Sequence, residues 1–205
     1  MHEPMRATDS ERQLNLTRGD AAAARFWIAR STLPEEDKAD LLRFVARFPW
    51  LTFVKEDPVL LDRYAEADQV ALPKWFRDVR STLAFVEPSV LIRVDDFQWY
   101  DSPRADDVEE IWYDLRPGCG GEEERDLFTN HGGIFPIGSD WDDGATHLGI
   151  DLENSGDRRI FDFHGEDLLD NRLSGRPVRG SLYPVFSSYA QLLAHVVELR
   201  PLLGN

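Results

Sequence analysis

The chain has 205 residues, of which 42% are hydrophobic and 11% aromatic, so it has enough apolar side chains to form a core and global disorder is excluded. Its formal net charge is −15 at pH 7. A surface of this sign repels phosphate groups, which disfavours nucleic-acid binding, and attracts basic partners. The same acidity also serves solubility, and composition does not separate the two roles.

The negative charge belongs to one part of the chain. Residues 95–170 contain 22 acidic residues and five arginines, a balance of −17, whereas the remainder carries 16 acidic and 18 basic residues. A basic protein partner is therefore expected to approach this part first, because opposite charges steer diffusional encounter.

The expected compartment follows from the N-terminus, the hydropathy and the cysteine content. The segment Met1-His2-Glu3-Pro4 lacks the basic and apolar succession of a signal peptide, and no apolar run approaches the roughly 18 residues of a membrane helix. Cys119 is the single cysteine, so an intrachain disulfide is excluded. We expect a cytoplasmic protein without a membrane anchor.

Residues 1–70 are predicted to form a helical extension, of which residues 1–19 lack periodicity and are expected to fray. Asp20 is a helix-capping residue before an alanine-rich helix that ends near Arg30. A second helix is expected to begin around Pro34, where acidic residues suit its N-terminus, and to end at Pro49. Its buried face is predicted to carry Leu41, Leu42, Val45 and Phe48.

Two further helices are predicted before the period of the sequence changes. Asp57-Pro58 opens a short helix, because proline at the first helical position loses no hydrogen bond. Leu72-Pro73 opens the next. Its buried face is predicted to carry Trp75, Phe76, Val79 and Leu83.

From Ser89 onward the apolar residues recur at every second position, which predicts strands. Strands are expected at 89–97, at 111–115 and, with Leu127-Phe128, at 133–137. The residues 146–152 and 159–165 flank an Asn-Ser-Gly-Asp turn at 154–157 and predict a hairpin. Residues 122–124 and 166–184 are expected to be loops. A final helix is predicted over 187–199, capped by Ser187 or Ser188.

This order of elements predicts an α+β fold. It consists of N-terminal helices, a mostly antiparallel twisted sheet of about five strands, and a C-terminal helix packed on the sheet. One face of the sheet is expected to pack against the helices that begin at Leu72 and Ser187. That face is predicted to carry Phe135, Ile137, Leu148, Ile150, Phe161 and Phe163.

Several short motifs occur in a characteristic order. Phe135-Pro136-Ile137-Gly138 is followed by a Gly/Asp loop at 138–144, by a strand that ends in Asp151-Leu152, and by a helix start at Ser187-Ser188-Tyr189. This order, together with Leu72-Pro73, resembles the SUKH superfamily, the Smi/Knr-like domain of many bacterial immunity proteins. The resemblance covers about residues 72–199. It implies a non-catalytic α+β domain at 71–205 that binds other proteins, typically a toxin that it neutralises.

The sequence gives little support for a catalytic site or a metal site. The loop 138–144 has acids and a glycine, but Ile150 stands where a calcium loop needs glutamate. The histidines lack zinc spacing, although a joint site of His131, His147 and His164 on neighbouring strands stays open. Cys119 lies in a flexible glycine loop, a poor platform for a nucleophile. We therefore expect no enzyme, no metal and no cofactor.

The candidate binding site is an acidic surface that carries aromatic residues. Most aromatic side chains are expected in the core, but three lie within acidic loops, a composition typical of interface anchors for a basic protein. The predicted partner-binding residues are Trp99, Tyr100, Asp140, Trp141, Asp142 and Asp143. A housekeeping interaction scaffold of the same fold and an unrecognised small hydrolase remain alternatives, and the oligomeric state is open.

Overall fold

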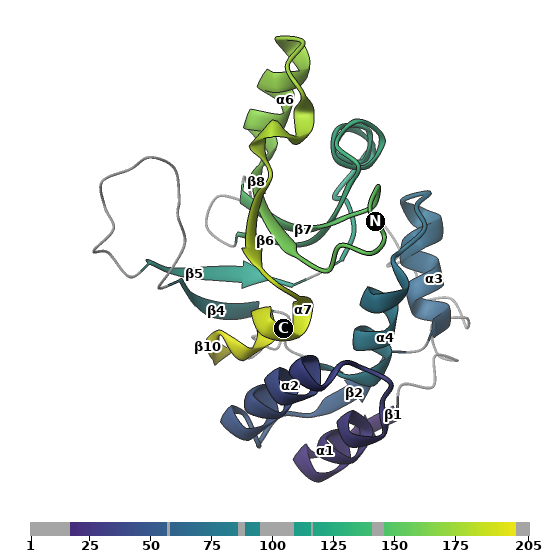
Figure 1. Cartoon of the computed structure of the whole chain (residues 1–205), viewed down its shortest axis with the longest axis vertical. Helices are drawn as coiled ribbons and strands as arrows, with labels where there is room; N and C mark the ends of the chain where they lie inside the picture. Colours follow the sequence, from purple (N-terminus) through teal and green to yellow (C-terminus); the bar gives the residue numbers. More distant parts are fainter. Residues whose placement is uncertain are drawn as a thin grey trace, which may run out of the picture.

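A curled antiparallel sheet of seven strands forms the centre of the fold, with the strand order β10-β4-β5-β6-β7-β8-β9 (Figure 1). A second, three-stranded sheet of order β1-β2-β3 lies among the N-terminal helices. The computed structural model describes residues 17–56, 58–85, 89–94, 109–115, 117–140 and 146–199. The α+β class is confirmed, but the main sheet has two strands more than the five expected.

The elements of the N-terminal part are β1 Thr17–Gly19, α1 Ala21–Arg30, α2 Glu35–Arg47, β2 Phe53–Lys55, α3 Pro58–Ala67, α4 Lys74–Thr82 and β3 Ala84–Phe85. The main sheet follows with β4 Ser89–Val94, β5 Glu109–Asp114, β6 Ile134–Asp140, β7 Thr146–Asp151, β8 Ile160–His164, β9 Tyr183–Phe186 and β10 Val196–Leu199. The helical segments between or after these strands are α5 Glu122–Arg125, the π-helix η2 Asp126–His131, α6 Gly165–Leu173, the 3₁₀ helix η3 Val178–Ser181 and α7 Tyr189–Ala194.

The first two helices begin for the predicted reasons. The carboxylate of Asp20 accepts hydrogen bonds from the backbone N–H groups of Ala22 at 3.0 Å and Ala23 at 2.9 Å, which caps α1. In α2 the buried stripe differs from the expected one, since Leu42 is 38% exposed and Phe44 is buried in its place. Residues 41, 44, 45 and 48 follow helical spacing, whereas position 42 lies beside that stripe.

The small sheet corrects the expectation for the N-terminus. Residues 17–19 were expected to fray, but they pair antiparallel with β2, which in turn pairs with β3. The sequence predicted neither β2 nor β3, because strands of two or three residues are too short to show a period.

A buried ion pair within the N-terminal part is joined by a hydrogen bond to the C-terminal helix. Arg80 of α4 donates from Nε to Glu56 Oε2 at 2.7 Å and from a second guanidinium nitrogen to Glu56 Oε1. It also donates to the hydroxyl of Tyr189 in α7 at 2.7 Å. Burial alone lowers the pKa of Arg80, but Tyr189 and Glu56 outweigh it and raise that pKa. The guanidinium therefore stays charged and holds these elements together.

The predicted hairpin is confirmed. Strands β7 and β8 pair antiparallel with Ile150 opposite Ile160, and the turn closes with a hydrogen bond from Asp157 N to Asn154 O at 2.9 Å. Strand β6 pairs with β7 on the other side, with Phe135 opposite Ile150. One core cluster contains side chains of the sheet that face α4 and α7, together with side chains of these two helices. Its members from the sheet include Phe135, Ile137, Leu148, Ile150 and Ile160, and its members from the helices include Phe76, Leu192 and Leu193.

Two aromatic residues of β8 face the other way from the prediction. Phe161 lies opposite Gly149 and Phe163 opposite His147, so both point away from the side that carries Leu148 and Ile150. They belong to a second, smaller core cluster. The side of β8 that faces the main core carries Ile160 and Asp162 instead.

The C-terminal half contains more regular structure than expected. Residues 122–131, expected to contain a loop and a strand, are helical, and 166–184 includes α6, η3 and β9. Pro177 precedes η3 and Pro184 lies in β9 at the edge of the sheet, where a missing N–H is tolerated. The final helix ends at Ala194 and not at residue 199. Val196 and Val197 are extended in β10, which pairs with β4, and β-branched residues suit a strand.

The helical part and the sheet share one core. The main cluster runs from Ala21 and Ile28 of α1 to Leu193 and Val196 near the C-terminus, and α2 packs beside α7 (Figure 1). The domain boundary at residue 71 stays a prediction. Within the described segments, every helix is too short or too polar to cross a bilayer.

Candidate functional site

The side of the sheet that faces away from the main core, which we call the outer face, carries its own layer of helices. α6 and η2 lie side by side on it, with α6 projecting at the top of Figure 1. They cover a second cluster of buried side chains that comprises Phe128, Ile134, Phe161, Phe163 and Leu168. The central strands are thus buried on both faces, and β7 is buried along its whole length.

His147 lies at the centre of the outer face. Only 7% of it is exposed, and it sits on β7 between Ser139 of β6 and Phe163 of β8. Its ring stacks on Phe163 with centroids 5.2 Å apart and meets the ring of Phe128 edge-on at 4.9 Å. His147 and Glu124 line two cavities, so these cavities meet at the same side chains.

The larger cavity, of about 490 Å³, lies between η2 and α6, and we call it the outer cleft. Its apolar lining is formed by Leu127, Phe128 and Leu169. Acidic side chains also line the cleft, and Arg172 is the one arginine or lysine among the described lining residues. The acidic residues are Glu123, Glu124, Asp126 and Glu166.

Part of this acidity is already compensated. Arg172 pairs with Asp126 at 2.9 Å, and this hydrogen bond lowers the pKa of Asp126. Glu124 accepts a hydrogen bond from Gly120 N at 2.6 Å. Glu123 and Glu166 are exposed and have no ion-pair partner among the described residues. The outer cleft therefore presents two uncompensated carboxylates beside apolar side chains.

The smaller cavity, of about 340 Å³, contains polar side chains that suggest acyl-transfer chemistry. Asp114, Ser139 and His147 lie on three consecutive strands and line it together. However, a catalytic relay needs the imidazole between serine and carboxylate, and here the serine stands in the middle. At a strand spacing of about 4.8 Å, Asp114 lies roughly 10 Å from His147. The arrangement does not form a relay.

Cys119 lines the smaller cavity too, but it is not an activated thiol. Burial raises its pKa to about 12, and the nearby Asp68 and Glu124 act in the same direction. A thiol with this pKa remains protonated at neutral pH, and the thiolate is the nucleophilic form. The side chain of Asp68 instead accepts a hydrogen bond from Cys119 N at 3.2 Å, which fixes the loop.

The joint histidine site is not formed. His164 lies opposite Thr146, and its Nε2 is 2.8 Å from Thr146 Oγ1, so it faces the opposite side of the sheet from His147. His131 is exposed in η2, where its Nδ1 lies 2.8 Å from Asp126 O. In the parts of the chain that the structure describes, no group of three or more metal-binding side chains converges.

Of the predicted partner-binding residues, Asp140 is described. It ends β6 opposite Tyr113 of β5. The others lie outside the described residues. They are Trp99, Tyr100, Trp141, Asp142 and Asp143.

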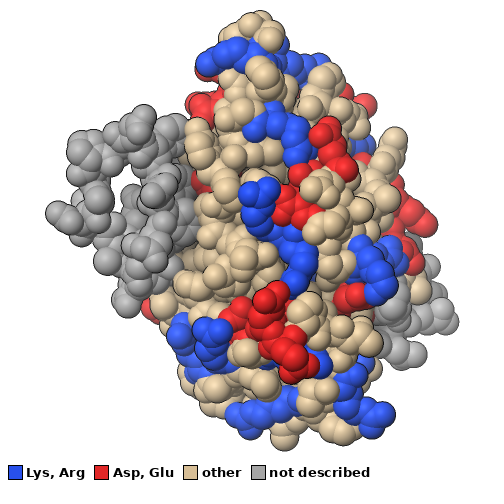
Figure 2. Space-filling view, in the orientation of Figure 1, with Lys and Arg blue, Asp and Glu red and all other residues tan. Residues whose placement is uncertain are grey.

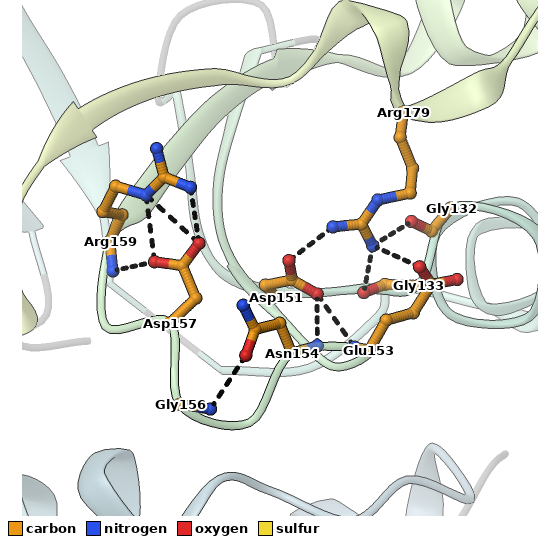
Figure 3. Close-up of polar contacts among 9 residues, drawn as sticks. All are labelled: Gly132, Gly133, Asp151, Glu153, Asn154, Gly156, Asp157, Arg159 and Arg179. Atoms are coloured by element: carbon orange, nitrogen blue, oxygen red, sulfur yellow. Dashed lines mark hydrogen bonds and ion pairs between the residues drawn. The ribbon is translucent and has the colours of Figure 1, made fainter.

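The motif residues of the hairpin have a structural role, which Figure 3 shows. Asp151 accepts hydrogen bonds from the backbone N–H groups of Glu153 at 2.8 Å and Asn154 at 3.1 Å, and it pairs with Arg179. Arg179 also donates to the carbonyl oxygen of Gly133 at 3.4 Å and pairs with Glu153 at 3.2 Å. The network fixes the start of β6 and the end of β7 to η3.

The Phe-Pro-Ile-Gly segment marks an irregularity in β6. The pairing with β7 shifts between Pro136 and Gly138. A Cβ atom at Gly138 would lie 2.9 Å from Leu115 Cδ2 and 3.1 Å from the carbonyl oxygen of Asp114. Glycine is needed here because β5 approaches closely.

Comparisons with models of protein families, with curated proteins and with solved structures found no match to this chain. The SUKH resemblance therefore stays a prediction that rests on its motifs.

The face of the molecule in Figure 2 mixes both signs of charge, with basic and acidic side chains interspersed. Net charge therefore does not locate an interface by itself.

The sequence did not predict the outer cleft, because 127–128 was predicted as a strand and 166–184 as a loop. A signal was present: Leu168, Leu169 and Leu173 have helical spacing, with acids before them and Arg172 near the end.

Proposed function

We propose that this chain is a non-catalytic protein-binding domain of the immunity-protein type, which binds and neutralises a cognate bacterial toxin. The observation that carries the proposal is the outer cleft, where apolar side chains stand beside the uncompensated carboxylates Glu123 and Glu166. The order of the SUKH-like motifs supports the same class of function. Trp99, Tyr100 and Trp141 lie outside the described residues and remain predicted contacts of the partner.

The chemistry of the outer cleft favours a basic protein over other ligands. Nucleic acids and phosphorylated metabolites would be repelled by the carboxylates. A basic protein would gain steering from the charge and affinity from burying Leu169, which is exposed, and Leu127, which is partly exposed. The acidic part of the chain would then act mainly on the rate of association.

Two alternatives compete with this proposal. A housekeeping scaffold would bind a partner through the same surface without a toxin. A small hydrolase is favoured by the neighbouring Ser139 and His147 in the smaller cavity. Esterase activity of the purified chain on a panel of activated esters would support the hydrolase if the Ser139→Ala variant loses that activity.

The direct experiment searches the genes that neighbour the gene for this chain and takes any toxin-like reading frame found there as the candidate toxin. Expressed alone it should arrest growth, and coexpression of this chain should restore growth. The purified proteins should associate more slowly as salt rises, because exposed charges are screened beyond about 8 Å at physiological ionic strength. Growth arrest that persists on coexpression, with no complex between the purified proteins, would refute the proposed function.

A further inference from the structure

We propose that the outer cleft receives a basic amphipathic helix of the partner. In this arrangement, which rests on the proposed function, the apolar face of the helix inserts side chains between η2 and α6, and its lysines or arginines pair with Glu123 and Glu166. The argument uses the shape of the apolar surface, the backbone of its walls and the position of the free carboxylates.

The apolar surface is elongated. Leu169 lines the outer cleft and is 43% exposed, and Leu173 is 75% exposed one turn further along α6. Residues four apart lie on the same side of a helix, so these two leucines extend the apolar lining along the α6 axis. A volume of about 490 Å³ holds a few large side chains rather than a whole helix. The occupant therefore lies across the opening and inserts anchors at intervals.

The walls favour a helix over an extended segment. An extended peptide must pair its backbone N–H and C=O groups, and it usually does so at the edge of a sheet. Here the walls are helices whose backbone groups are largely engaged internally. The β9 edge of the sheet carries Pro184, which removes one donor. A helix satisfies its own backbone and needs only apolar contacts in the cleft.

The charges select a basic helix. Glu123 stands on α5 at one wall and Glu166 on α6 at the other, so carboxylates flank the apolar lining from both sides. Arg172 is already paired with Asp126 and adds no net positive charge to the rim. A helix with leucine or tryptophan on one face and lysine on the flanks complements this arrangement.

The test uses a fluorescent peptide of about 15 residues with leucines at helical spacing and lysines elsewhere, and a second peptide of the same composition in scrambled order. Binding is followed by fluorescence anisotropy. The amphipathic peptide should bind at least about tenfold tighter than the scrambled one. Leu169→Glu, and separately the pair Glu123→Lys with Glu166→Lys, should each weaken its binding at least about tenfold.

Matched controls separate local from general effects. Leu42→Glu changes another exposed leucine, on α2, and the pair Glu66→Lys with Glu198→Lys makes the same change in net charge at exposed sites outside the cleft lining. Both controls should bind within about twofold to threefold of the unmodified chain. Melting temperatures measured alongside should stay unchanged, because every substituted side chain is exposed.

Equal binding of the two peptides, no measurable binding of either, or full binding by Leu169→Glu would each overturn the inference. Coexpression with the toxin distinguishes its failure from that of the proposed function. If Leu169→Glu still restores growth, the function stands and the cleft is not the interface. If the unmodified chain fails to restore growth yet selects the amphipathic peptide, the cleft inference stands and the toxin assignment fails.

Discussion

Asp162 is a buried carboxyl group on the side of β8 that faces the main core. It lies opposite Leu148 and is 2% exposed, and its Oδ1 has no hydrogen-bond partner among the described residues. Burial raises its pKa from 3.8 to about 8, and the nearby charge of Asp140 acts in the same direction. The folded protein therefore holds this side chain in its neutral form at pH 7.

The consequence for stability follows from linkage. Because the folded pKa of Asp162 lies above the unfolded one, the unfolded state loses its proton first as pH rises. Stability falls progressively from about pH 4 to about pH 8 and is then constant with respect to this group. At about 1.4 kcal/mol per unit of pKa shift, the loss between pH 5 and pH 8 is about 4 kcal/mol. That is a large share of the 5–15 kcal/mol typical of a domain.

Urea unfolding of the unmodified chain and of Asp162→Asn, at pH 5 and at pH 8, measures this effect. Asparagine keeps the shape but cannot ionise, so the variant should gain about 4 kcal/mol relative to the unmodified chain between the two pH values. Asp157→Asn is the matched control, because a hydrogen bond from Arg159 lowers the pKa of Asp157. The stabilisation that the ionised Asp157 provides is lost only as pH falls through its folded pKa, below about pH 4. The Asp157→Asn difference should thus be the same at pH 5 and pH 8, and a pH-independent difference for Asp162→Asn as well would refute the reasoning.

Three further predictions follow from buried or constrained positions. Cys119, with its pKa raised to about 12, should react with iodoacetamide at pH 7.5 far more slowly than a cysteine peptide, as followed by mass spectrometry; equal rates would show an exposed or activated thiol. Glu56→Gln leaves the charge of Arg80 buried without its carboxylate and should lower the free energy of unfolding by about 3–5 kcal/mol, so an unchanged urea midpoint would contradict the role of the pair. Gly133→Ala should lower the melting temperature more than Gly175→Ala. Both glycines have positive φ, but only at Gly133 would a Cβ atom meet other side chains, those of Glu153 and Arg179. Equal decreases in melting temperature would argue against that contact.

Local signals predicted much of the fold. The Asp20 cap, the apolar stripe of α4 and the hairpin turn at Asn154 each depend on a few neighbouring residues, and the structure has all three. The same local reasoning failed where tertiary pairing decides. Residues 196–199 continue the apolar pattern of a helix, yet they are extended as β10 and pair antiparallel with β4.

The wrong prediction for the face of the β8 aromatic residues and the failure to predict the outer cleft have one physical cause. Alternation in a strand separates two faces but does not say which face meets the larger core. Phe161 and Phe163 are the stronger apolar pair, so they were assigned to the main core, and that assignment left the other face without a covering layer. Once α6 and η2 are present, both faces of the strand are buried, and the weaker pair, Ile160 and Asp162, turns to the main core. The unusual carboxyl group of Asp162 and the proposed helix-binding cleft are therefore consequences of the same second layer. A sequence interpretation that treats 166–184 as a loop has no means of predicting either one.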